Sequence, residues 1–179
     1  MQRPLNKSIG LLGGSFDPAH KGHLEISKIA IKKLKLKKLL WVVSKKNPFK
    51  NKPLYSLKQR IIKAKRIVKN SENIQVSYLD KSAGSSRSIN LVNYLIKKKK
   101  LKNIHFIIGS DNLIKFHKWK SWKKIVKLTK LVVFSRMGYD KKAKKSIVAN
   151  FLKNKIIFIN NKPIVISSTK LRKKALKNF

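Results

Sequence analysis

The sequence lacks cysteine and has few acidic residues, and both shortages narrow the class of protein. Without cysteine among its 179 residues, it cannot hold a disulfide framework, an iron–sulfur cluster, a cysteine-ligated zinc ion or a catalytic thiol. No apolar run approaches the ~20 residues of a membrane-spanning helix. The segment from Met1 to Gly14 also lacks the anatomy of a signal peptide. We therefore expect a cytoplasmic protein without a membrane partner.

Acidic residues are so scarce that six Asp and Glu oppose 46 Lys and Arg, which leaves a net charge of +40. One interpretation is a nucleic-acid-binding protein, whose affinity would come from neutralised phosphates. The other is a composition bias in which lysine serves as the default surface residue. The cations are spread from Lys7 to Lys177 without interleaved aromatic residues, which favours the bias. We expect no specific nucleic-acid partner, although this charge would attract any anionic substrate.

Hydrophobic residues make up 42% of the chain, and their spacing alternates between strand and helix patterns. The predicted strands span 8–13, 39–43, 74–79, 104–108, 131–134 and 156–159. The predicted helices span 22–34, 57–68, 88–99, 112–128 with a break near His117, 141–153, and a short segment from Ser167. We interpret 44–53 and 81–86 as loops. This alternation predicts an α/β fold, a doubly wound parallel sheet in a single domain, residues 1–179.

Ligands of such folds bind beyond the carboxyl ends of the strands, where the strand order reverses. The unusual residues of this chain gather in four loops that follow strands. These loops span 13–23, 44–53, 109–119 and 160–172. We therefore expect the functional site at this edge of the sheet.

The first of these loops reads Gly13-Gly-Ser-Phe-Asp-Pro-Ala-His-Lys-Gly-His23. Its two leading glycines allow a tight turn with close backbone approach. Gly22 and His23 fall in the first helical turn, where free N–H groups favour an anion. His20 lies three residues before His23, so both imidazoles can face one phosphate and stabilise charge on a transferring phosphoryl group. A metal ion held by the two histidines is the alternative.

Five segments of the sequence resemble motifs of a known family. The 13–23 loop resembles the H-x-G-H signature of nucleotidyltransferases, and its longer form resembles bacterial nicotinate-nucleotide adenylyltransferases. The segment Ile166-Ser-Ser-Thr-Lys-Leu-Arg172 is similar to the family's I-S-S-T-x-I-R. The segment from Gly109 to Trp122 is similar to its G-x-D-x-L-x-x-F-x-x-W-x-x-W, which phosphopantetheine adenylyltransferases lack. Asn47-Pro-Phe-Lys50 and Arg136-Met-Gly138 resemble shorter family motifs. The resemblance covers almost the whole chain and implies a Rossmann-like nucleotidyltransferase fold.

The resemblance also implies an activity, the joining of ATP and nicotinate mononucleotide into deamido-NAD with release of pyrophosphate. Such a transfer needs positioning and charge neutralisation more than covalent catalysis by the protein. Mg²⁺ would arrive with ATP, without metal ligands from the protein. A nicotinamide mononucleotide or phosphopantetheine acceptor remains the alternative within the superfamily. A homodimer also remains open, and no residue indicates one.

Family roles carry over to the matching positions of this sequence. The implied catalytic residues are His20, on the triphosphate, and His23, at the α-phosphate in the transition state. The implied ATP-binding residues are Gly13, Gly14, Ser15, His20, Gly22, His23, Lys50, Arg136, Ser167, Ser168 and Arg172. The implied mononucleotide-binding residues are Phe16, Ser88, Gly109, Asp111 and Trp119. Asp111 would bind ribose hydroxyls or cap the 112–116 helix, and Trp119 would stack on the pyridine ring or, alternatively, belong to the core. We expect Trp122 in the core.

The sequence departs from the family pattern near Ser88. Arg87 stands where the family usually has tyrosine, and we hypothesise that it adds a cation for the nicotinate carboxylate. We expect Arg60 to support the 44–53 loop rather than to bind substrate. The sequence ends seven residues after Arg172, where many members continue, so we expect a thinner wall on the base side or one supplied by a partner subunit.

Overall fold

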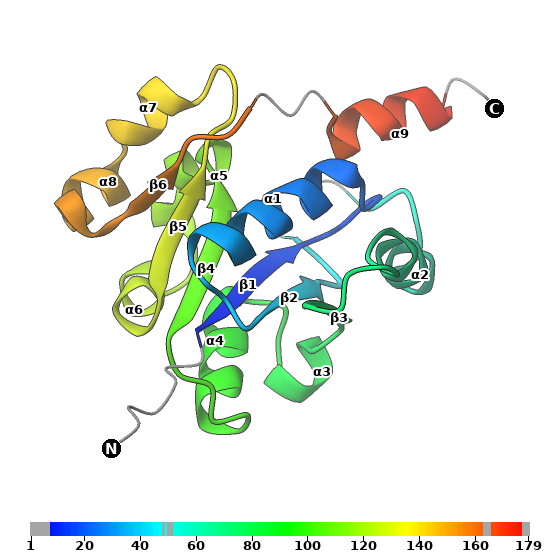
Figure 1. The fold of residues 1–179 in the computed structure, drawn as a ribbon, viewed down its shortest axis with the longest axis horizontal. Helices are drawn as coiled ribbons and strands as arrows, with labels where there is room; N and C mark the ends of the chain where they lie inside the picture. The colour runs from blue at the N-terminus through cyan, green and yellow to red at the C-terminus, as the bar shows by residue number, and fades with distance from the viewer. Residues whose placement is uncertain (1–7, 48, 50–51, 163–165, 177–179) are drawn as a thin grey trace.

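A computed structural model describes residues 8–47, 49, 52–162 and 166–176 of the chain. Its six strands form one parallel sheet in the order β3-β2-β1-β4-β5-β6 (Figure 1). The strands are β1 (Ile9–Gly14), β2 (Lys38–Val43), β3 (Ile74–Ser77), β4 (Ile104–Gly109), β5 (Lys130–Phe134) and β6 (Ile157–Ile159). The strand order reverses between β1 and β4. The predicted doubly wound parallel sheet is therefore confirmed.

Helices connect the strands. They are α1 (Lys21–Lys33), α2 (Leu57–Ile67), α3 (Asp80–Ala83), α4 (Ser88–Lys97), α5 (Ser110–Lys115), η1 (Phe116–Lys118), α6 (Trp122–Leu128), α7 (Asp140–Lys144), α8 (Ile147–Leu152), η2 (Lys153–Lys155) and α9 (Ser168–Leu176). The predicted break near His117 is confirmed, since the 3₁₀ turn η1 separates α5 from α6. In the described part of the chain, every helix is too short or too polar to cross a membrane.

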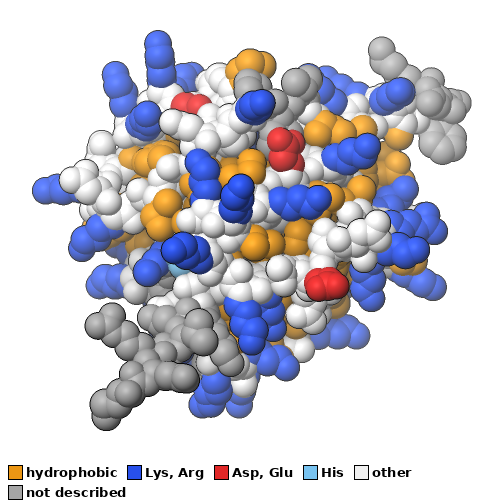
Figure 2. Space-filling view, viewed as in Figure 1, with side chains coloured by type: hydrophobic (Ala, Val, Ile, Leu, Met, Phe, Trp, Pro, Cys, Tyr) orange, Lys and Arg blue, Asp and Glu red, His pale blue; other side chains and the backbone are white. Residues whose placement is uncertain are grey.

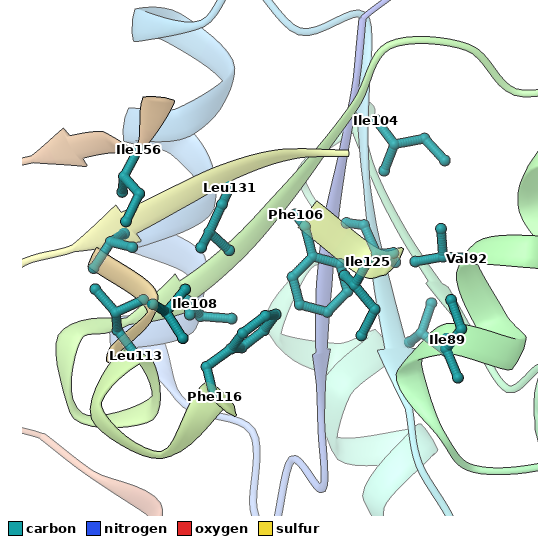
Figure 3. Packing of buried hydrophobic residues seen from close by; sticks show 14 of the residues in the cluster. Ile89, Val92, Ile104, Phe106, Ile108, Leu113, Phe116, Ile125, Leu131 and Ile156 are labelled. Atoms are coloured by element: carbon teal, nitrogen blue, oxygen red, sulfur yellow. The ribbon is translucent and has the colours of Figure 1, made fainter. Parts of the chain in front are cut away.

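Two hydrophobic layers cover the two faces of the sheet, because successive side chains of a strand point to opposite faces. Leu11 and Phe106 face the layer formed by α4 to α8, whose packing Figure 3 shows around Phe106, Phe116 and Ile125. Their neighbours Leu12 and Ile107 face the layer formed by α1 and α2. Strands buried on both faces read as continuous apolar runs, which is why they were predictable.

Two predicted segments differ from the structure. The expected 81–86 loop begins inside the four-residue helix α3, which ends at Gly84 in a left-handed conformation with φ 71°. The expected helix 141–153 is divided into α7 and α8. Ser146 makes this division, because its hydroxyl accepts a hydrogen bond from the Ala149 N–H and so caps a new helix.

Lys and Arg side chains are as scattered over the face shown in Figure 2 as they are along the sequence. On this face they are spread over the whole outline instead of forming one patch. This distribution agrees with lysine as a general surface residue.

Candidate active site

The first loop, residues 13–23, contains the turn from β1 to α1 and is anchored by a buried acid. Asp17 has 4% of its surface exposed. Its carboxylate accepts hydrogen bonds from the backbone N–H groups of Leu54 and Tyr55, both at 3.0 Å. The same carboxylate lies 3.6 Å from Nη1 of Arg172. One side chain thus holds the first loop, the start of α2 and the last helix together.

The last motif of the sequence packs directly on this loop (Figure 1). The Ser168 hydroxyl donates to the carbonyl of Pro18 at 3.0 Å, and Nη1 of Arg172 donates to the carbonyl of Asp17 at 2.8 Å. Ser167 precedes α9 and its hydroxyl accepts from the Lys170 N–H at 3.3 Å. The structure therefore brings together the two motifs that the sequence places at opposite ends.

The two histidines lie side by side at the start of α1. Their ring centroids are 3.9 Å apart, and the His20 backbone N–H points at Nδ1 of His23 at 3.3 Å. His20 is 9% exposed. Burial, assisted by the positive charge of Arg136, lowers the pKa of His20 to about 4. At neutral pH His20 is therefore an uncharged imidazole that can donate or accept a hydrogen bond.

Two aromatic side chains pack against His23. The Phe16 ring is 3% exposed and packs against Trp41 and His23, with 5.0 Å between ring centroids in each case. The Trp41 indole N–H donates to the Ser27 hydroxyl, which donates to the His23 carbonyl, both at 2.8 Å. The structure thus places the side chain of Phe16 in the core, so that its backbone is what remains for a ligand contact.

Asp111 and Arg136 meet across the carboxyl ends of β4 and β5. Nη1 of Arg136 lies 2.8 Å from Oδ2 of Asp111. A side chain at Gly109 would put its Cβ 2.5 Å from Oδ1 of Asp111, so glycine makes room for this carboxylate. The Arg136 backbone N–H is fixed by Ser110 Oγ at 3.1 Å and by Oδ1 of Asp140 at 3.0 Å. The two residues expected on different substrates are therefore neighbours.

A cavity of about 230 Å³ opens beside the glycines that end β1. Its apolar wall includes Trp119, whose ring lies 4.8 Å from that of Phe116 and meets Phe106 edge-on at 6.2 Å. The predicted residues that line it are Gly13, Gly14, Ser88 and Trp119. The cavity thus combines the flat ring of Trp119 with a stretch of backbone that carries no side chains, at Gly13 and Gly14.

Cations from three separate segments also line this cavity. They are Lys46, Arg87, Lys118 and Lys120, all exposed. The cavity contains one acid among its lining residues, Asp80, whose carboxylate accepts from the Lys45 backbone N–H at 2.7 Å. Burial raises the pKa of Asp80. The hydrogen bond from the Lys45 N–H and the positive charge of Arg60 lower it, but by less. The rim is therefore strongly positive, which suits an aromatic ligand that carries negative charge.

Comparison with known proteins identifies the family. The cytidylyltransferase-like family matches residues 11–174. A "probable nicotinate-nucleotide adenylyltransferase" of Pelagibacter ubique is 52% identical over 166 residues, which cover 92% of each chain. The chain belongs to the nicotinate-nucleotide adenylyltransferases of the cytidylyltransferase-like family. Another such relative, from Clostridium tetani, is 33% identical over 177 residues, 96% of this chain and 88% of its own.

Solved structures confirm the Rossmann-like nucleotidyltransferase fold of this family. The nicotinic acid mononucleotide adenylyltransferase of Plasmodium falciparum, complexed with NaAD, superposes with a TM-score of 0.74 at 21% identity. The superposition covers 93% of this chain and 83% of the other.

Not every residue expected to act in this nicotinate-nucleotide adenylyltransferase lies on the cavity. Gly13, Gly14, Ser88 and Trp119 do. His20, His23, Ser168 and Arg172 lie in the neighbouring histidine and α9 region, and Asp111 and Arg136 pair at the carboxyl ends of β4 and β5. Lys50 lies outside the described residues. Trp122, which was expected in the core, is only partly buried: it packs against the core and meets Phe151 edge-on at 5.1 Å.

Sequence reasoning about this adenylyltransferase missed several residues. Lys46, Lys118 and Lys120 line the cavity, but among forty lysines nothing marked them. Asp80 and Asp140 had a usable signal, because acids are rare here and each serves as a hydrogen-bond acceptor for a backbone N–H at the site. The predicted support of the 44–53 loop by Arg60 is confirmed by its hydrogen bonds to the carbonyls of Ser44 and Lys45.

Proposed function

We propose that this chain transfers the adenylyl group of ATP to nicotinate mononucleotide, giving nicotinate adenine dinucleotide and pyrophosphate in NAD biosynthesis. The names of its relatives support this assignment. The observation that carries it is the cavity, where the Trp119 ring and a cationic rim lie next to Gly13 and Gly14 of the first loop. A flat surface suits a pyridine ring, and the cations suit its carboxylate and the 5′-phosphate.

The reaction is an in-line displacement at phosphorus. An oxygen of the mononucleotide 5′-phosphate forms a bond to the α-phosphorus of ATP. The bond from that phosphorus to the oxygen it shares with the β-phosphate breaks, and its electron pair leaves on pyrophosphate. No covalent bond to the protein is needed, so the chain acts by holding both substrates and stabilising charge.

The residues of the first loop take the phosphate roles in this proposal. His23 holds the α-phosphate as charge develops on it, and the backbone from Gly13 to Ser15 holds neighbouring oxygens. His20 acts as a neutral hydrogen-bonding group on the triphosphate, because burial keeps its pKa near 4. Gly22 belongs to the first turn of α1, whose N–H groups we assign to the anion. Such fixed donors are effective because they need no reorganisation during the reaction.

The α9 motif holds the outer phosphates in this proposal. Ser167, Ser168 and Arg172 take the β- and γ-phosphates. Nη1 of Arg172 donates to the Asp17 carbonyl, and Nη2 donates to the Thr169 hydroxyl. A guanidinium has five N–H donors, so others remain for phosphate. Lys50 would reach the same phosphates. The hydrogen bonds of Arg172 therefore orient it as well as tying α9 to the first loop.

Asp111 and Arg136 take a role at the boundary between the substrates. We assign Asp111 to the ribose hydroxyls of the mononucleotide, together with backbone groups at Gly109 and Phe16 and the hydroxyl of Ser88. Arg136 faces ATP. Their 2.8 Å contact keeps both charges in place before substrates arrive.

Mg²⁺ commonly accompanies ATP in adenylyltransferases and fits this site as a substrate-borne ion. Among the described residues, no three His, Asp or Glu side chains cluster to hold a metal. Mg²⁺ prefers phosphate oxygens and water to a cage of protein ligands. When bound to ATP it neutralises charge on the leaving pyrophosphate. We place the reaction in the cytoplasm, the compartment that supplies ATP.

Pyrophosphate release tests the proposal. The protein is mixed with Mg-ATP and, separately, nicotinate mononucleotide, nicotinamide mononucleotide or phosphopantetheine, with His23→Ala as the control. We expect release with nicotinate mononucleotide that the His23→Ala variant loses. Release with phosphopantetheine alone would overturn the role of Trp119 and the acceptor proposed here. If none of the three acceptors gives pyrophosphate release, the proposed function is overturned.

A further inference from the structure

Arg60 is a buried cation whose contacts extend beyond the loop it was expected to support. It lies on α2 and is 2% exposed. Nε donates to the carbonyl of Tyr55 at 3.1 Å, and Nη2 donates to that of Lys45 at 3.2 Å. Nη1 donates to two carbonyls, Ser15 at 2.6 Å and Ser44 at 2.7 Å. A buried guanidinium is costly unless it is bonded in this way.

Two of these carbonyls lie just beyond the end of the β1–β2 ladder. The last backbone bond between these strands runs from the Ser44 N–H to the Gly14 carbonyl at 2.9 Å. The next carbonyls, of Ser15 and Ser44, are both acceptors and cannot bond to each other. Nη1 of Arg60 bonds to both, so it continues the pairing of the two chains past the sheet.

The Lys45 peptide is held from its other side as well. Its N–H donates to Oδ2 of Asp80 at 2.7 Å, while its carbonyl accepts from Arg60. Burial lowers the pKa of the Arg60 guanidinium, and the carboxylates of Asp17 and Asp80 oppose that shift. Lys46 is the next residue, and it lines the same cavity as Gly13 and Gly14 of the first loop.

We propose that Arg60 is a positioning residue that sets the separation of the first loop and the 44–47 segment, and thereby aligns the two substrates for in-line attack. This inference rests on the proposed function, in which the first loop holds ATP and the cavity holds the mononucleotide. Arg60 touches neither substrate. Its planar fork fixes four carbonyls at once, whereas a lysine supplies a single point of donation.

Substitution should therefore act on turnover more than on binding. Each loop keeps its own ligand contacts, but a shift of one against the other misplaces the attacking oxygen. A misplacement of about 1 Å can lower the rate by about 100-fold. In Arg60→Lys we expect kcat to fall on the order of 10- to 100-fold, while KM for each substrate changes less than about threefold.

The experiment measures kcat and both KM values of the full chain below the unfolding temperature of each variant. Arg66→Lys is the matched control, since Arg66 lies on the same helix but is exposed. Arg60→Ala is assayed with and without added guanidinium ion, which we expect to restore part of kcat. Circular dichroism gives the folded fraction, so that the rates refer to folded protein.

The possible results separate the two proposals. An Arg60→Lys variant with the kcat of the parent chain would overturn the role of Arg60, as would a loss explained by the unfolded fraction or seen only in KM. If Arg60→Ala does not fold, Arg60→Lys decides alone. A parent chain that is inactive with nicotinate mononucleotide would instead overturn the proposed function.

Discussion

The histidine and α9 region and the cavity region lie next to each other but are built in opposite ways. In the first, side chains bond to backbone groups of distant segments, as Asp17 bonds to Leu54 and Tyr55 and Arg172 bonds to the first loop. In the second, exposed Lys and Arg side chains surround an open space with one aromatic wall. We therefore expect the first region to be held in place before a ligand arrives and the long cationic side chains of the second to become ordered on binding.

This difference matches the demands of the proposed reaction. Charge at a transferring phosphoryl group is stabilised best by donors that are already fixed. Recognition of a charged acceptor tolerates flexible cations, each contributing little. Substitutions in the first region should therefore alter turnover or stability strongly, and substitutions of the cavity cations should alter selectivity weakly.

The largest effect is expected at His23. We predict that His23→Ala lowers kcat by about 100- to 1,000-fold, because it removes a fixed donor at the α-phosphate. Steady-state pyrophosphate release measures the loss. Lys21→Ala is the control, since Lys21 lies exposed in the same helical turn. Equal kcat values for the two variants would contradict the role of His23.

The next effect concerns pH and His20. Its pKa is about 4 in the folded chain against 6.5 for the free side chain, so the unfolded chain binds the proton more readily. This contribution to stability is complete above pH 6.5 and is lost as the pH falls toward 4, by about 3 kcal/mol. Urea unfolding of the parent chain and of His20→Gln across this range measures it. Identical pH slopes would show that His20 is not the cause.

The two tryptophans offer a sharper contrast. Trp119→Ala should raise KM for nicotinate mononucleotide on the order of tenfold, because stacking on an aromatic ring contributes about 1–3 kcal/mol. Trp122→Ala should leave this KM unchanged and lower the free energy of unfolding by about 3 kcal/mol, since Trp122 packs against Phe151. Initial rates and urea unfolding distinguish them. The reverse pattern would exchange the two assignments.

The smallest effect is expected at Arg87. Its exposed cation faces the cavity, and exposed charge pairs contribute about 0.2–1 kcal/mol. Arg87→Ala should lower the preference for nicotinate over nicotinamide mononucleotide by about two- to fivefold. The ratio of kcat/KM values measures it, with Arg66→Ala as the control. An unchanged ratio would sink the hypothesis of an added carboxylate-binding cation.

Much of the fold could be predicted because its strands are buried on both faces. Runs such as Leu39 to Val43 have no polar interruption and are too short for helices. Short helices and single helix caps could not be predicted in this way. Four residues are too few to show helical periodicity, so α3 was interpreted as a loop. The break before α8 depends on a single Ser146 cap inside an otherwise helical pattern.

The candidate site was predictable where rare residues follow a strand. Glycine and histidine are uncommon here, so the 13–23 loop stood out. The pairing of Asp111 with Arg136 was not predictable, because it joins residues that meet only after β4 and β5 align. The same holds for Arg172 on Asp17, whose partners lie at opposite ends of the chain.

The contact between α9 and the first loop affects the order in which the chain folds. Ser168 and Pro18 are 150 positions apart, and Arg172 and Asp17 are 155 apart. During synthesis β1 and α1 leave the ribosome long before their partner helix exists. The sheet can assemble first, whereas closing so long a loop costs entropy and comes late. A nascent chain would thus acquire the proposed triphosphate-binding surface late in folding.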